Sequence, residues 1–426
     1  MEKTLILSSG RCSWGKCFAC GWGKLEAPVN EEEAKRKVEA LELAGVERLK
    51  VFASGSFFDD AQFPRTFRRW FAKHLISNGV KELVIESRPE FVTQESISDF
   101  NGLKLTVGIG LECADNGVLK KYNKGFTVED FEKAAALLHK NNASVRTYLM
   151  VNMPFSSAEL LDKSVAFAKR HSDSIVLINT FPHSKSRLFD DWISGKWSPM
   201  STAEFEKAVK KYSKDKMIET DSQNYMFVPK FPPEKKEKIA GATSEVLNHP
   251  YFRVWQDFFQ RFYEVPKGKE NVLFLQCSFQ KPYSRSNTHK KISGVLCDFP
   301  GFLNKTHLVV LSTPGVVPFE YEDYYPFNAY DWPEWEETDE IRAEYRKVVG
   351  ERIKKYLETH KYKRYYSYLK PSSDTFAALK KACEDAGVNL VSLVDDKTFS
   401  LVADEKNPLV RPEMLGALRR KLGGLR

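Results

Sequence analysis

The sequence predicts an α/β fold, a partial (β/α)6 barrel followed by a second α/β domain. Short apolar runs alternate with amphipathic stretches through the first half of the chain, as in a parallel sheet with crossover helices. The chain has 426 residues, whereas single cores seldom exceed about 250 residues. The alternation stops after residue 185, where a Lys- and Pro-rich boundary region begins. We therefore place the domains at residues 1–230 and 231–426.

The elements follow in order along the chain. Within the first domain, the helix over 127–142 opens with a Thr-x-x-Asp cap, and the helix over 30–45 ends at a glycine. In that domain, strands are expected at 4–10, 47–55, 81–89, 103–112, 144–154 and 173–181, and helices at 30–45, 64–79, 93–100, 127–142 and 157–171. In the second domain, helices are expected within 236–265, 339–360 and 373–387, and strands at 271–277, 307–312, 364–370 and 389–394.

The cysteine content, the hydropathy and the charge of the chain limit the class of protein and the compartment that we expect. The seven cysteines are an odd number with one cluster, which favours metal binding or catalysis over a disulfide framework. No window approaches the roughly 20 apolar residues of a membrane span, and the first residues do not resemble a signal peptide. We therefore expect a cytoplasmic protein with no membrane partner. The net charge of +8 suits a polyanionic partner without naming one.

Three cysteines, Cys12, Cys17 and Cys20, lie close together in the loop after the first expected strand. A structural zinc ion takes four ligands, usually as two close pairs, and the other cysteines are scattered along the chain. A [4Fe-4S] cluster held by three thiolates leaves one iron open for a cofactor, as S-adenosylmethionine cleavage requires. The pattern favours the cluster. The alternatives are a zinc ion that borrows a distant histidine, and simple burial of the thiols.

Polar residues also follow the other expected strands. In barrels of this kind, function collects at the carboxyl ends of the strands. The residues at those ends are Ser54, Gly55, Ser56, Arg88, Glu112, Asn152 and Asn179. A structural interpretation stays open for them, because Ser-Gly-Ser is often a plain turn and a glutamate at a strand end is often merely solvated.

The first half of the chain resembles the radical SAM superfamily, and within it the archaeosine-biosynthesis radical SAM subunit. The similar segments are VFASGSFFD, IESRPEFVT, VGIGLECADNGVLKKYNKGFT and YLMVNMPF, and the resemblance covers about residues 1–185. Four residues separate the first two cysteines where the superfamily usually has three, and the subfamily shares such a lengthened loop.

This resemblance implies both cofactors and their sites. It implies that Cys12, Cys17 and Cys20 hold a [4Fe-4S] cluster. It also implies that the segment Ser54-Gly55-Ser56 meets the methionine amino group of S-adenosyl-L-methionine, and that Arg88 and Glu112 face that cofactor.

In the second half, QCSFQKPYSRSNTHKK follows a strand and crowds polar residues into one loop. The loop is either a site or a basic, hydroxyl-rich surface. It resembles the Cys-Ser-x-x-Lys-Pro-Tyr-Ser motif of the lysine-transferring subunit of archaeosine synthase, over about residues 245–400, with departures at Gln276 and Phe319. The resemblance makes Cys277, Lys281 and His289 candidate catalytic residues. Cys277 is the possible nucleophile, with its pKa lowered by Lys281 or His289.

Together the two resemblances imply a fused archaeosine synthase, a carbon-nitrogen lyase of tRNA modification. One subunit of that pathway adds lysine to 7-cyano-7-deazaguanine in tRNA, and the radical SAM subunit cleaves the adduct to archaeosine. Two alternatives stay open: a radical SAM lyase that works with a separate archaeosine synthase subunit, and a zinc-stabilised tRNA-binding protein. Lysines at 207–216 and 235–238 and the tail 418–426 offer phosphate contacts for 7-deazaguanine-modified tRNA. A free base is the alternative substrate.

Overall fold

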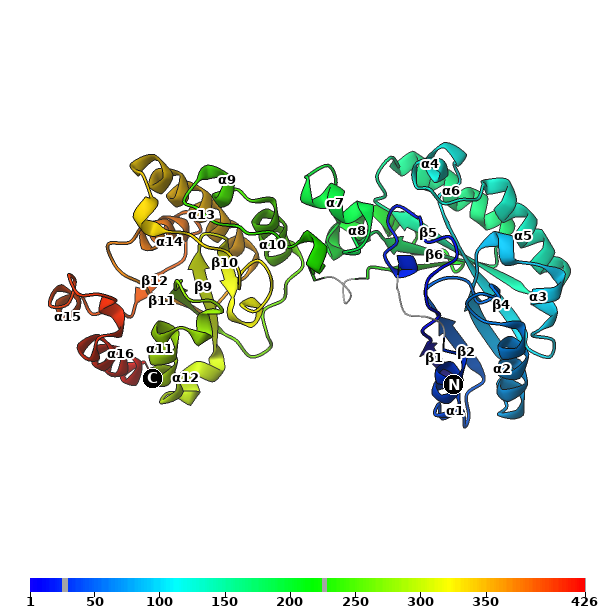
Figure 1. The fold of residues 1–426 in the computed structure, drawn as a ribbon, viewed down its shortest axis with the longest axis horizontal. Helices are drawn as coiled ribbons and strands as arrows, with labels where there is room; N and C mark the ends of the chain where they lie inside the picture. Colours follow the sequence, from blue (N-terminus) through cyan, green and yellow to red (C-terminus); the bar gives the residue numbers. More distant parts are fainter. Residues whose placement is uncertain (25–29, 224–227, 426) are drawn as a thin grey trace. The chain divides into compact units, whose positions relative to one another are not determined.

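The computed structural model of the chain describes residues 1–24, 30–223 and 228–425. The chain divides into two compact units, Met1–Phe227 and Val228–Arg426. Each unit is a β-sheet flanked by helices (Figure 1). None of the helices in the described ranges is long and apolar enough to cross a lipid bilayer.

The first unit is built on a curled, seven-stranded sheet in which every neighbouring pair is parallel and the strands follow chain order from β1 to β7. Its helices lie along the outer side of this half-barrel (Figure 1). The elements are β1 (Glu2–Ile6), α1 (Glu31–Glu39), β2 (Arg48–Phe52), α2 (Arg65–Ser77), β3 (Glu82–Glu86), α3 (Gln94–Ser98), β4 (Lys104–Glu112), α4 (Asn116–Lys121), α5 (Val128–Lys140), β5 (Ser144–Val151), α6 (Ala158–His171), β6 (Ser174–Asn179), α7 (Arg187–Ile193), α8 (Thr202–Val209) and β7 (Ile218–Asp221).

Alternation along the strands separates the two faces of this sheet. In β4, Leu105, Val107, Ile109 and Leu111 are buried and belong to the hydrophobic core of the unit. Because side chains alternate along a strand, Gly108, Gly110 and Glu112 face the opposite, concave side. The expected cap of the helix over 127–142 is present, since Thr127 and Asp130 form a capping box at the start of α5.

The seventh strand differs from the six-strand prediction. β7 has four residues, Ile-Glu-Thr-Asp, and none of them is buried. It pairs in parallel with β6, with Ile218 opposite Ile175. Backbone hydrogen bonds to β6 hold this strand in the sheet. Its sequence contains no apolar run from which a strand could be predicted.

The second unit contains a five-stranded sheet in the order β10-β9-β8-β11-β12. All its neighbouring pairs are parallel except β9 with β10, which is antiparallel. The fold class therefore agrees with the prediction of a second α/β domain. The elements are α9 (Ser244–Leu247), α10 (Pro250–Arg261), β8 (Asn271–Gln276), α11 (Asn287–Cys297), α12 (Pro300–Lys305), β9 (Thr306–Ser312), β10 (Gly315–Pro318), α13 (Asp339–Thr359), β11 (Arg364–Tyr368), α14 (Asp374–Asp385), β12 (Leu390–Ser392), α15 (Asp396–Ser400) and α16 (Pro412–Gly424).

Candidate functional site

The loop that carries the three cysteines follows β1 and is fixed by the segment after α4. The Phe18 amide donates to the Tyr122 carbonyl at 2.9 Å, and the Trp14 indole donates to the Asn123 carbonyl at 2.8 Å. The Asn123 side chain donates in turn to the Lys16 carbonyl at 3.1 Å. These bonds hold the loop between Cys12 and Cys20 at the carboxyl end of the sheet.

The three thiols are half-buried and lie among donors. The Arg88 guanidinium is 3.8 Å from Cys17 Sγ, and the Gly23 amide donates to Cys20 Sγ at 3.4 Å. A β-carbon at Gly23 would lie 3.9 Å from Cys12 Sγ. Burial raises the pKa of Cys20. Gly23 therefore lies beside the sulfur atoms of Cys12 and Cys20, and Arg88 lies beside that of Cys17.

The spacing of these thiols bears on the choice between zinc and a cluster. Within residues 1–24, 30–223 and 228–425, no three His, Cys, Asp or Glu side chains converge closely enough to hold one metal ion. A single zinc ion would require that convergence, because its Zn–S bonds are about 2.3 Å long. A [4Fe-4S] cluster instead bonds its thiolates to different irons and accepts wider spacing. Three thiolates are the donor set that such a cluster takes when one iron stays open for another ligand.

The segment after β2 is more than a plain turn. Ser54 donates through its hydroxyl to the Gly10 carbonyl at 2.9 Å, and its amide donates to Ser9 Oγ at 3.0 Å. A β-carbon at Gly55 would lie 2.0 Å from the Gln62 side chain, so a larger residue there would displace the amide oxygen that accepts from the Ser56 amide. Ser56 Oγ accepts from the Arg88 amide at 3.0 Å. The segment therefore joins the start of the cysteine loop to the end of β3.

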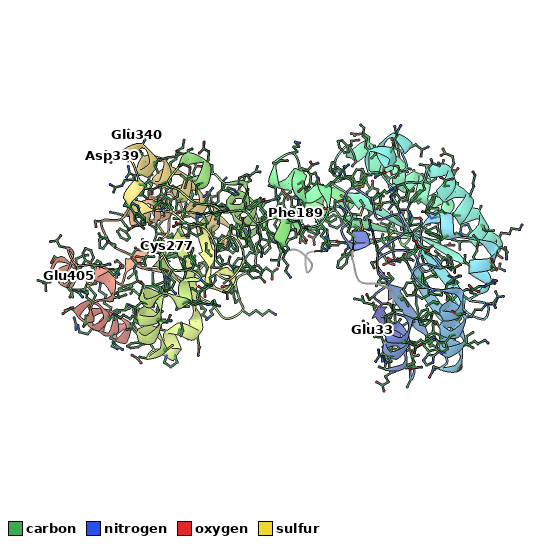
Figure 2. All side chains as sticks on the ribbon, in the orientation of Figure 1. Glu33, Phe189, Cys277, Asp339, Glu340 and Glu405 are labelled. Atoms are coloured by element: carbon green, nitrogen blue, oxygen red, sulfur yellow. The ribbon has the colours of Figure 1, made fainter. Side chains whose placement is uncertain are left out.

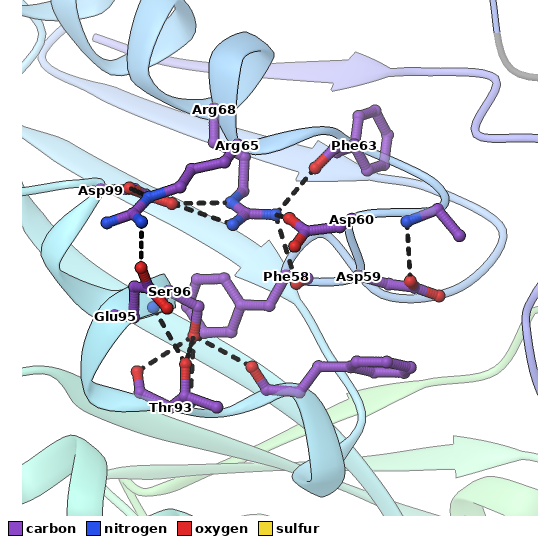
Figure 3. Close-up of polar contacts among 12 residues, drawn as sticks. Phe58, Asp59, Asp60, Phe63, Arg65, Arg68, Thr93, Glu95, Ser96 and Asp99 are labelled. Atoms are coloured by element: carbon purple, nitrogen blue, oxygen red, sulfur yellow. Dashed lines mark hydrogen bonds and ion pairs between the residues drawn. The ribbon is translucent and has the colours of Figure 1, made fainter.

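A buried arginine holds the rest of this β2 loop (Figure 3). Arg68 donates to the carbonyls of Phe58 and Phe63, at 3.3 and 2.8 Å, and to the carboxylate of Asp60 at 2.7 Å. Asp99 accepts from Arg68 at 3.0 Å and is itself fully buried. Because a buried ion pair with satisfied hydrogen bonds is costly to break, the loop has a fixed shape.

Charged side chains from the segment after β3, from the end of β4 and from the loop after α4 meet beside Cys17. Arg88 donates to the Lys124 carbonyl at 2.7 Å and lies 5.3 Å from the Trp14 ring. Lys124 forms an ion pair with Glu112. Burial lowers the pKa of Lys124, but Glu112 and Cys17 outweigh it and leave that pKa raised. Glu112 itself has a φ of 66°, a left-handed conformation that costs energy for any residue except glycine.

The end of β6 holds two polar atoms without partners among the described residues. Asn179 Oδ1 and Thr180 Oγ1 are buried and accept or donate no hydrogen bond there. The amide nitrogen of Asn179 is occupied, because it donates to the Met200 carbonyl at 3.0 Å. Asn152, at the end of β5, uses its side chain to bind the Ser198 carbonyl at 3.0 Å. Asn152 therefore has a structural contact, whereas Asn179 and Thr180 retain capacity to bind a ligand.

The concave face of the sheet carries a polar group that sequence reasoning did not single out. Burial raises the pKa of Glu86, at the end of β3, to about 7. Tyr148 interacts with both Glu86 and Arg146, and Arg146 donates to Glu219 at 2.8 Å. A β-carbon at Gly108 would lie 2.9 Å from the Tyr148 hydroxyl, so this glycine makes room for the tyrosine. The available signal was a glutamate closing the otherwise apolar run Leu-Val-Ile.

In the second unit, Cys277 lies just after β8 (Figure 2). The Lys281 ammonium lies 4.0 Å from the centre of the Tyr330 ring, and burial lowers its pKa. Tyr283 donates to Ser312 Oγ at 3.1 Å. Cys277 and Lys281 interact electrostatically, so the loop does gather these polar groups at the strand ends.

The surroundings of Cys277 do not lower the pKa of its thiol, and its role as a nucleophile stays a prediction. Burial, reinforced by Glu334 and Glu337, raises the pKa of its thiol to about 12 despite the opposing effect of Lys281. Burial also lowers the pKa of His289 to about 4, so this histidine is neutral and supplies no positive charge. His289 Nε2 hydrogen-bonds the Gln276 carbonyl at 2.9 Å. These side chains are buried more deeply than a loop sequence reveals.

Comparison with known proteins assigns the first unit. Residues 8–168 match the radical SAM superfamily. The first unit contains a radical SAM domain. Its cofactors are a [4Fe-4S] cluster and S-adenosylmethionine, and the half-buried thiols and the open polar atoms of Asn179 and Thr180 fit them. Residues 252–405 match a domain of unknown function, DUF5591.

Three curated relatives share parts of this chain. Archaeosine synthase subunit beta of Thermococcus kodakarensis is 36% identical over 39% of this chain and 53% of its own length. The protein of that name from Methanosarcina acetivorans is 31% identical over 46% of this chain and 62% of its own. Archaeosine synthase subunit alpha of Thermoplasma acidophilum is 32% identical over 28% of this chain and 25% of its own. The chain therefore spans less than two thirds of each relative.

Proposed function

We propose that this chain is a radical SAM lyase of archaeosine biosynthesis. It would break a carbon-nitrogen bond in a lysine adduct of 7-cyano-7-deazaguanine in tRNA, in the cytoplasm, and leave archaeosine on the tRNA. The radical SAM domain and the relatives named archaeosine synthase subunit beta support this reaction. The observation that carries it is the set of three half-buried thiols in one loop, two of which accept hydrogen bonds, Cys17 from Arg88 and Cys20 from the Gly23 amide.

The three cysteines, Arg88 and Lys124 receive roles in this proposal. Cys12, Cys17 and Cys20 would hold a [4Fe-4S] cluster, which would supply the electron that cleaves S-adenosylmethionine. The guanidinium of Arg88 lies 3.8 Å from Cys17 Sγ, so it offers a hydrogen bond and a positive charge to a sulfur atom that would bind the cluster. Lys124 adds a second positive charge, which also acts on Cys17.

Binding of S-adenosylmethionine falls to groups at the carboxyl ends of the strands. The segment from Ser54 to Ser56 offers backbone groups in a fixed turn, and we assign it to the methionine end of the cofactor. We assign Glu112, at the end of β4, to the same cofactor, together with the partnerless atoms of Asn179 and Thr180. A buried polar atom without a partner is costly unless a ligand satisfies it.

The carboxyl group of Glu86 lies on the concave face of the sheet, where we place the reacting groups. With a pKa of about 7, Glu86 exchanges its proton near neutral pH and can accept hydrogen bonds from amino groups. We assign it, together with Tyr148, to orienting amino groups of the cofactor or of the lysine adduct. Positioning of this kind contributes by holding reactants in a reactive geometry.

We assign the second unit to binding the modified base. The strand-end cluster of Cys277 and Lys281 supports a site there, and a relative named archaeosine synthase subunit alpha matches part of this chain. Lysine transfer by the same unit is the second candidate function. Its nucleophile would be Cys277, whose pKa of about 12 leaves it a thiol at neutral pH, so attack would need a base to remove the proton. If the second unit does not transfer lysine, a separate archaeosine synthase subunit must supply the adduct.

The test uses the full chain, reconstituted with iron and sulfide without oxygen and then reduced. With S-adenosylmethionine and tRNA that carries the lysine adduct, we expect archaeosine to appear in the nucleosides released by digestion, measured by mass spectrometry. Cys17→Ala should abolish product, whereas Cys297→Ala, at an exposed cysteine in the second unit, should not. Unchanged adduct in the native reaction would contradict the proposal.

Two further arms separate the candidate functions. Free lysine and tRNA carrying 7-cyano-7-deazaguanine replace the adduct in the first arm. Adduct formed by the native chain and lost with Cys277→Ala would establish lysine transfer. In the second arm, cleavage of the free modified base but not of the tRNA would show that the substrate is not RNA.

A further inference from the structure

Two large aromatic side chains stand exposed on the second unit. Phe279 is 73% exposed and Trp335 is 75% exposed. Their ring centres are 6.2 Å apart and their planes meet at 38°. Rings of this size are usually buried in monomeric proteins, so a pair of them in water marks a surface that binds something.

This aromatic pair, Phe279 and Trp335, belongs to the loops around Cys277. Phe279 follows Cys277 by two residues, and its carbonyl accepts a hydrogen bond from the Lys281 ammonium at 3.3 Å. Trp335 follows Glu334, whose charge acts on both Cys277 and Lys281. The two rings therefore lie at the outer side of the same group of residues.

The loop of Trp335 is held in place by a buried neighbour. The Trp332 side chain is 8% exposed, and its indole nitrogen donates to the Glu337 carboxylate at 2.6 Å. Trp332 fills the core, so Trp335 is not needed for that purpose and presents its ring to solvent from a fixed loop.

We propose that Phe279 and Trp335 stack an unpaired nucleobase at the entrance of the Cys277 site. The identity of the base as a 7-deazaguanine rests on the proposed function, whereas the stacking does not. Aromatic side chains are the usual stacking surfaces for bases that have left a helix. A base with a guanine-like edge also offers N–H donors, and the exposed carboxylate of Glu334 accepts them.

The charge around the pair favours a base over the phosphate backbone. Glu334, Glu336 and Glu337 surround Trp335 in the sequence, and carboxylates repel phosphates at short range. The backbone would therefore keep to the outside while one base enters, as in enzymes that take a base out of the stack. Neutral nucleoside is consequently the sharpest probe, because it isolates stacking from phosphate contacts.

The experiment measures the dissociation constant of 7-cyano-7-deazaguanosine for the full-length protein by calorimetry. Phe279→Ala and Trp335→Ala should each weaken binding about tenfold, within the range found when stacked aromatics are truncated. Trp335→Phe should retain most of the affinity because it keeps a ring. Leu401→Ala is the matched control, since Leu401 is 80% exposed in the same unit, and it should bind as the native protein does.

Several results would overturn the assignment. Equal affinity in the native protein and both alanine variants would do so, and so would no binding to the native protein. Loss of affinity for free lysine with no loss for the nucleoside would identify a cation site instead. Formation of 5′-deoxyadenosine, measured on the same variants, should not change. Failure of the radical chemistry therefore remains separable from failure of the stacking proposal.

Discussion

Gly125 is a point at which one added methyl group should disturb the cysteine loop. Its φ is +80°, and a β-carbon there would lie 2.4 Å from the Trp14 ring. The Trp14 indole holds the loop through the Asn123 carbonyl and lies beside Arg88. In Gly125→Ala the indole must move, and both contacts are lost.

The expected loss of stability follows from three contributions. A left-handed conformation costs alanine roughly 1–2 kcal/mol. The lost hydrogen bond costs about 1 kcal/mol, and the lost cation-π contact costs about 0.5–1 kcal/mol. Together, Gly125→Ala should destabilise the first unit by roughly 3 kcal/mol. For a unit of this size that corresponds to a fall of about 6–12 °C in Tm.

Thermal unfolding and iron content after reconstitution measure the effect. Gly79→Ala is the matched control, because Gly79 has a φ of +82° with no atom within 4 Å of a β-carbon. This control should lose only the roughly 1–2 kcal/mol of backbone strain and bind iron normally, whereas Gly125→Ala should also bind less iron. Equal Tm values and equal iron content in the two variants would refute the role given to Trp14.

Two more predictions concern titratable groups. The pKa of Glu86 is about 7 when folded and 4.5 ordinarily, so folded protein holds a proton that unfolded protein loses, and stability falls as pH rises between these values. Glu86→Gln should therefore raise the free energy of unfolding of the first unit by about 1–2 kcal/mol at pH 8 but not at pH 4. Glu82→Gln is the control. An equal gain at both pH values would contradict the raised pKa of Glu86. At pH 8, iodoacetamide should modify exposed Cys297 well before Cys277, whose pKa is about 12, as peptide mass spectrometry can show; faster modification of Cys277 would mean an activated thiol.

Apolar runs made the sheet of the first unit predictable. Buried strands such as β4 repeat Leu, Val and Ile on one face, and that pattern depends only on the sequence. β7 escaped prediction because its four residues are held by backbone pairing with β6 and none is buried. A strand without an apolar face leaves no periodic signal.

The part of the candidate site that lies within one short segment was predictable from the sequence. Three cysteines in nine residues indicate a shared ligand by themselves. The ion pair of Lys124 with Glu112 and the raised pKa of Glu86 depend instead on strands brought together by folding. The expected lowering of the Cys277 pKa fails for the same reason, because burial and the distant Glu334 set that pKa more strongly than Lys281 nearby in the sequence.

The most direct test of the central claim is formation of 5′-deoxyadenosine by the reduced, reconstituted full-length protein in the presence of S-adenosylmethionine. We predict product with the native protein and with Cys297→Ala, and none with Cys17→Ala. Zinc bound in place of iron, with no 5′-deoxyadenosine from the native protein, would contradict the account and make the three cysteines structural.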